Sequence, residues 1–158
     1  MTDNDVEDLI QNYVSDIETI KMLGFDGVEL HGAHGYMIDQ FFWRDTNIRK
    51  DKYGKEEDLR TKFVCEIVSR ARKLVGNDFP IMLRFSQWKQ QDYEALLAPS
   101  PEDLETFLGP ISDSGVDVFH ASTRRYWEPE FEGSNLNLAG WTKKITNKPT
   151  ITVGSVGL

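Results

Sequence analysis

Two histidines and a tyrosine stand close together in the segment 31–36, which has the sequence HGAHGY. The spacing of His31 and His34 allows two imidazole nitrogens to approach one oxygen atom, and Tyr36 adds a phenol that is a usable proton donor. The segment could therefore bind an oxygen atom of a small molecule, hold a metal ion as histidine pairs do, or make ordinary packing and loop contacts. No third metal ligand is obvious in the sequence, which argues against the metal.

An arginine and a glycine turn are the next candidates for chemistry. Arg84 lies within an expected strand, where a guanidinium needs an anion or a polar partner. That partner could be an electron-rich cofactor or Glu29 on a neighbouring strand. Gly154 and Ser155 follow the last expected strand, where backbone N–H groups could hold a phosphate or simply form a tight turn.

An aromatic loop follows the third expected strand. Tyr126 and Trp127 stand among cationic and acidic residues in the range 123–131, a composition that suits a lid over a flat ligand or a solvated loop. Cys65 lies on the apolar side of an expected helix and is interpreted as a core residue.

Apolar residues alternate along the chain between helix-like and strand-like spacing. A capping box at Thr2 opens a helix that ends near Gly24, and a long polar stretch at 32–56 is expected to be a functional loop. The other expected helices are 58–75, 101–111 and 136–145, and the expected strands are 25–31, 81–86, 116–120 and 149–154. Strands separated by helices predict an α/β fold with a parallel sheet. All three histidines, including His120, are expected at strand ends, where such folds gather functional groups.

The composition excludes several classes of protein. Lys and Arg total 18 and Asp and Glu total 26, so the formal charge of −8 argues against binding to nucleic acid or to an anionic membrane. No apolar run approaches the roughly 18 residues of a membrane span, and residues 1–8 do not resemble a signal peptide. A single cysteine favours a reducing, cytoplasmic location. The length of 158 residues predicts one domain and is too short for a closed eightfold barrel of about 200–250 residues.

The segment 24–41, with the sequence GFDGVELHGAHGYMIDQF, resembles the most recognisable stretch of the old yellow enzyme family of flavin-dependent oxidoreductases. The resemblance continues through 46–49, 51–54, 59–60 and 83–86. It implies that residues 1–158 form part of a (β/α)8 TIM barrel, about half of it, with four parallel strands matching barrel strands four to seven. It also implies FMN and NAD(P)H as cofactors.

The resemblance assigns roles to individual residues. His31 and His34 match the pair that hydrogen-bonds the carbonyl oxygen of the substrate, and Tyr36 matches the proton donor. Arg84 matches the arginine beside the flavin ring. The remaining matches are Gly154 and Ser155 at the FMN phosphate and, more loosely, Tyr126 and Trp127 at the substrate pocket.

The implied activity is that of an FMN-dependent NAD(P)H oxidoreductase of the ene-reductase type. Reduced FMN would transfer a hydride to an activated alkene, such as a small α,β-unsaturated carbonyl compound. We expect this chain alone to bind FMN weakly or not at all and to be inactive, because half of the implied site is missing. Two open sheet edges could pair with another copy. The alternatives are a non-catalytic α/β half-barrel that dimerises or binds a ligand, and a metal-dependent hydrolase that uses His31 and His34.

Overall fold

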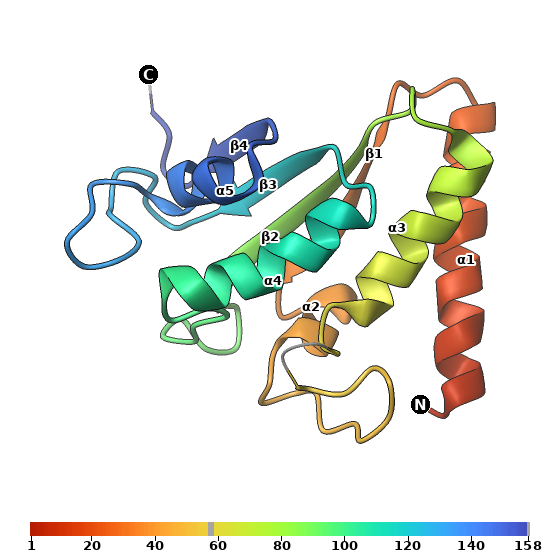
Figure 1. The fold of residues 1–158 in the computed structure, drawn as a ribbon, viewed down its shortest axis with the longest axis horizontal. Helices are drawn as coiled ribbons and strands as arrows, with labels where there is room; N and C mark the ends of the chain where they lie inside the picture. Colours follow the sequence, from red (N-terminus) through yellow and green to blue (C-terminus); the bar gives the residue numbers. More distant parts are fainter. Residues whose placement is uncertain (57–58, 158) are drawn as a thin grey trace.

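A four-stranded parallel sheet in the order β1-β2-β3-β4 organises the computed structural model, which describes residues 1–56 and 59–157. The elements follow one another as α1 (Asp3–Met22), β1 (Val28–His34), α2 (Met37–Phe42), α3 (Lys62–Val75), β2 (Ile81–Lys89), α4 (Pro101–Asp113), β3 (Val118–Ser122), α5 (Leu138–Thr146) and β4 (Thr150–Val153). Figure 1 shows α3, α4 and α5 along one face of the sheet, and α1 packs against α3. The predicted α/β class with four parallel strands is confirmed.

Local sequence accounts for the start of α1. The Thr2 hydroxyl accepts a hydrogen bond from the Asp5 N–H, and the Asp5 carboxylate accepts one from the Thr2 N–H, so the predicted capping box is present. The buried residues of this helix recur every three or four positions and face α3; they are Val6, Ile10, Val14 and Ile17.

The two faces of the sheet differ in character. Side chains on the helix-covered face are buried and apolar, among them Leu30, Leu83, Phe85, Phe119 and Ala121. On the opposite face, His31 pairs in register with Arg84, which pairs with His120. Because neighbours in register point to the same side of a sheet, these polar side chains form one row. The helices therefore stabilise the sheet from one side, and the polar row lies on the side that they do not cover.

All four strands differ from their expected limits, β4 by only one residue at each end. β1 begins at Val28 and continues to His34, so His31 lies inside the strand rather than at its end. β2 runs on to Lys89, because a β-bulge after Gly32 lets His34 pair with that residue. β3 covers 118–122, which places His120 at mid-strand and corrects the expectation that all three histidines lie at strand ends.

The segment 32–56 is not a continuous loop, because it contains α2. The helix expected from residue 58 begins at Lys62, and the expected start itself lies outside the described residues. Cys65 is partly buried against the core, and burial raises the pKa of its thiol to about 11, consistent with the predicted structural role. In the described part of the chain, none of the helices combines the length and apolar character that crossing a membrane requires.

Candidate functional site

Three of the predicted site residues meet at the carboxyl end of β1. The ring centroids of His31 and His34 lie 5.3 Å apart, and those of His31 and Tyr36 lie 5.4 Å apart. The contact depends on two consecutive residues with positive φ, 65° at His34 and 81° at Gly35, which bring Tyr36 back towards His31. The Tyr36 hydroxyl donates a hydrogen bond to Oε1 of Gln90 and is exposed. This geometry can present two imidazoles and a phenol to one small molecule.

The His34 ring is the most enclosed member of this group. It stacks on Trp88 with 4.4 Å between ring centroids, and its Nε2 atom lies 2.8 Å from Oγ of Ser122. Its backbone N–H donates to Oγ of Ser86 at 3.0 Å. Burial, reinforced by the positive charge of Arg84, lowers the pKa of His34 to about 4, so the imidazole is neutral at neutral pH.

Arg84, on the neighbouring strand β2, contacts the same Ser122 hydroxyl as His34. Its Nη2 atom donates to Oγ of Ser122 at 3.1 Å, while its Nε atom is enclosed and has no hydrogen-bond partner among the described residues. The suggested ion pair with Glu29 is absent, because the Glu29 carboxylate lies 2.7 Å from Nδ1 of His120 instead. A buried N–H without an acceptor is costly, so Arg84 offers a donor that a ligand could satisfy.

A buried ion pair between Lys89 and Asp39 lies next to the turn that carries these residues, and the sequence analysis did not predict it. Lys89 Nζ lies 2.7 Å from Oδ1 of Asp39, and both side chains are completely buried. The second carboxylate oxygen of Asp39 accepts the N–H of Gly35 at 2.7 Å, and Lys89 also donates to the carbonyl of Ser86. The pair therefore holds the turn between His34 and Tyr36 against the end of β2.

The glycine turn after β4 lies against the loop that leaves β3. A Cβ atom at Gly154, whose φ is 136°, would stand 2.3 Å from the carbonyl oxygen of Thr123, so only glycine fits. The Ser155 hydroxyl donates to the carbonyl of Arg124 at 3.0 Å. Thr123 directly follows Ser122, the residue that contacts His34. The turn and the histidines thus share the carboxyl end of the sheet.

Tyr126 and Trp127 lie apart from the histidines. Their rings contact each other at 5.5 Å between centroids, and the Tyr126 N–H donates to the carbonyl of Gly154. No ring contact joins either of them to His31 or His34 in the described part of the chain. The structure places them beside the glycine turn.

A cavity of about 200 Å³ lies beside Trp88 and Ser122, two residues that contact the His34 ring, and part of its lining comes from the predicted loop 123–131. Its walls include Trp88, Tyr93, Ser122, Arg124 and Glu130. Trp88 stands two residues after Ser86 on β2, so a correct limit for that strand would have placed both side chains on one face. Burial raises the pKa of the Glu130 carboxyl, which accepts a hydrogen bond from Gln87.

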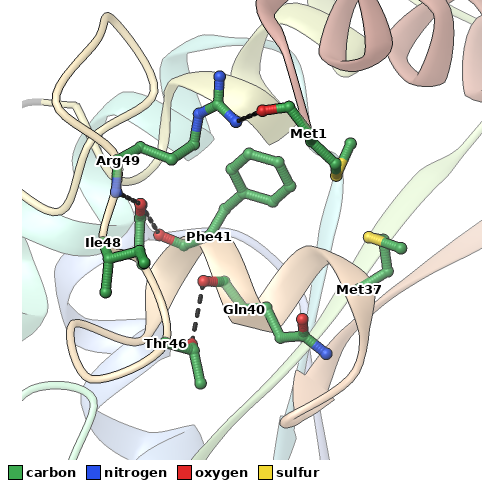
Figure 2. Close-up of a pocket in the computed structure, with 8 residues that line it drawn as sticks. Met1, Met37, Gln40, Phe41, Thr46, Ile48 and Arg49 are labelled. Carbon is green, nitrogen blue, oxygen red and sulfur yellow. Dashed lines mark hydrogen bonds between the residues drawn. The ribbon is translucent and has the colours of Figure 1, made fainter.

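A second hollow, of about 180 Å³, lies beside α2 and is separate from the candidate site. In Figure 2, Arg49 donates to the carbonyl of Met1, and Thr46 donates to the carbonyl of Gln40 across this hollow. None of the predicted site residues lines it. For the metal alternative, no group of three or more potential ligands comes together within residues 1–56 and 59–157.

The depressed pKa of His34 predicts a pH effect on stability. Between about pH 6.5 and pH 4 the unfolded chain binds a proton at this histidine and the folded chain does not, so stability falls as the pH falls. Relative to the His34→Asn variant, the wild type should lose about 1–2 kcal/mol between pH 7 and pH 5. Asparagine tolerates positive φ, which makes it the matched replacement.

Urea unfolding of the wild type and of the His34→Asn variant across this pH range measures the difference in their free energies of unfolding. The titration of the carboxylates is common to both proteins and cancels in this difference. Two parallel stability profiles would show that His34 titrates alike in the folded and unfolded chains.

The chain is similar in sequence to known proteins over almost its whole length. The family model described as the NADH:flavin oxidoreductase / NADH oxidase family matches residues 1–157. The chain is 39% identical over 164 residues to an NADH oxidase of Thermoanaerobacter brockii, covering 99% of this chain and 25% of that protein. It is 30% identical over 174 residues to a cinnamate reductase of Clostridium sporogenes, covering 98% of this chain and 26% of that protein.

The fold is similar to that of the old yellow enzyme homologue from Zymomonas mobilis. The TM-score is 0.81 at 20% sequence identity, and the match covers 99% of this chain and 44% of that chain. The four strands therefore correspond to part of a TIM barrel, as predicted. The chain spans about a quarter of the length of the two sequence relatives and less than half of the structural one.

Proposed function

The chain belongs to the NADH:flavin oxidoreductase / NADH oxidase family, and from that premise we propose that it acts in the reduction of an activated alkene by FMN and NAD(P)H. The observation that carries the proposal is the meeting of His31, His34 and Tyr36 around the end of β1, with Arg84 of β2 joined to His34 through Ser122. An α,β-unsaturated carbonyl compound suits this arrangement, since its oxygen would find donors and its α-carbon a proton. The relative named cinnamate reductase supports a substrate of this chemical class.

The residues present fit FMN. Arg84, whose enclosed Nε has no partner among the described residues, would hold the electron-rich ring, and the backbone turn at Gly154 and Ser155 would hold the phosphate. His120 contributes a second enclosed nitrogen without a partner among the described residues, in register with Arg84. Reduced FMN, when bound, supplies the hydride that the reaction requires.

The side chains of this chain handle the oxygen and the proton. His31 and neutral His34 donate hydrogen bonds to the carbonyl oxygen of the substrate, where negative charge grows during the reaction. A preplaced donor of this kind contributes about 2.7–4 kcal/mol to transition-state stabilisation. Tyr36, exposed beside His31, delivers a proton to the α-carbon.

Flavin binding tests the proposal through Arg84. We expect weak FMN binding by this chain, and an Arg84→Met variant should bind about tenfold or more weakly, because a charge-assisted hydrogen bond is lost. Riboflavin, which lacks the phosphate, should also bind more weakly than FMN. Quenching of flavin fluorescence measures each affinity.

Arg70→Met serves as the matched control, because Arg70 pairs with Glu66 and Glu7, away from the site. FMN and riboflavin binding equally, with no effect of Arg84→Met, would overturn the proposal. Turnover of NADPH with cyclohexenone is expected to be low or absent, because the chain spans only part of the length of its relatives.

A further inference from the structure

Ser122 is a buried hydroxyl between two functional groups. Its residue is only 2% exposed. Its Oγ atom lies 2.8 Å from Nε2 of His34 and accepts a hydrogen bond from Nη2 of Arg84 at 3.1 Å. These are the only hydrogen bonds of this hydroxyl in the described part of the chain. His34 and Ser122 are the last residues of β1 and β3, and Arg84 lies within β2, so the contact exists only in the folded sheet.

The number of protons on each group decides which of His34, Ser122 and Arg84 donates each hydrogen bond and which accepts it. A guanidinium only donates, whereas a hydroxyl has one proton and two lone pairs. If His34 carried its proton on Nε2, Ser122 would accept twice and its own buried proton would have no acceptor among the residues that the structure describes, at a cost of about 1–3 kcal/mol. If Nε2 is unprotonated, Ser122 accepts from Arg84 and donates to His34, and every group is satisfied.

We infer that Ser122, oriented by Arg84, holds neutral His34 in the tautomer that carries its proton on Nδ1. Stacking on Trp88 keeps the imidazole in the plane that this hydrogen bond requires. Nδ1 has no partner among the described residues and is not one of the enclosed polar atoms. The Nδ1–H group is therefore the donor that His34 offers outward.

The consequence for chemistry rests on the proposed function. A carbonyl oxygen that accumulates negative charge requires an N–H group, and the opposite tautomer would present a lone pair to it. Ser122 is thus a positioning residue, because it acts through His34 without itself having to touch the substrate. Sequence spacing does not reveal this role, since Ser122 lies 88 residues from His34.

Nitrogen NMR of the full chain tests the tautomer directly, without flavin or substrate. In protein labelled with ¹⁵N-histidine at about pH 8, Nδ1 of His34 should resonate in the N–H range and Nε2 in the unprotonated range. The His34→Asn spectrum assigns the signals. Ser122→Ala should shift His34 towards the Nε2–H form, Arg84→Met should shift it partly, and Ser122→Thr, which keeps the hydroxyl, should retain the wild-type pattern.

A wild-type His34 protonated on Nε2 would overturn the inference, and so would a folded Ser122→Ala variant with an unchanged pattern. If Ser122→Ala does not fold, the wild-type spectrum and the Ser122→Thr spectrum still decide the question. Failure of the flavin-binding test leaves this result intact, because the tautomer is measured on the free chain. The two proposals are therefore separable.

Discussion

Replacing Lys89 with methionine is expected to lower the free energy of unfolding by about 3–5 kcal/mol. The substitution leaves the Asp39 carboxylate fully buried and without its cation, although the carboxylate still accepts the N–H of Gly35. An uncompensated buried charge costs far more than the lost attraction between exposed partners. Urea unfolding at neutral pH measures the loss.

Two variants sharpen this prediction. Adding Asp39→Asn to Lys89→Met removes the stranded charge while keeping an acceptor for Gly35, and should recover much of the loss. Lys52→Met is the matched control, because Lys52 is exposed and its contact with Glu66 is 3.5 Å long; it should cost no more than about 1 kcal/mol. Equal losses at Lys89 and Lys52 would refute a special role for the buried pair.

Replacing Phe63 with alanine is expected to cost about 3–5 kcal/mol of stability. Phe63 is completely buried, and its ring stacks on Phe41 of α2 with 4.0 Å between centroids. The edges of Tyr13 and Tyr53 close around it at 6.2 Å and 6.4 Å. The loss comes from the apolar area and from the cavity that remains when the surrounding rings cannot collapse.

Thermal or urea unfolding checks this value against Phe25→Ala, whose side chain is 62% exposed and should change stability by no more than about 0.5 kcal/mol. Because α2 also carries Asp39, the Phe63→Ala variant should disturb the His34 signals in the NMR experiment. Unchanged His34 signals would show that the site does not depend on the anchoring of α2.

The architecture was largely predictable from local pattern, whereas the extents of the strands were not. Helical spacing and the capping box were sufficient to place α1, because those signals act within one turn of the chain. The length of β2 depends on pairing with β1 beyond the bulge, a contact between His34 and Lys89. Because these two residues are 55 positions apart, the sequence around Ser86 gives no sign of their pairing, and the predicted strand therefore ended at Ser86.

The candidate site was also predictable only in part. The convergence of His31 and Arg84 could be predicted, because both were assigned to the carboxyl halves of parallel strands. The partners of these residues could not, since they depend on register. Glu29 lies in the row of Met82, two pairs before the row of Arg84, and its carboxylate contacts His120 instead. Ser122 and Trp88 were missed for the same reason.

The left-handed backbone at His34 has a consequence for how this protein can change over evolution. A non-glycine residue in that conformation costs about 1–2 kcal/mol, and glycine or asparagine would adopt it more easily. Selection for thermal robustness alone would therefore remove the imidazole. A lineage that keeps histidine at this position keeps the strained backbone together with the imidazole, and laboratory evolution towards heat resistance should replace this residue early.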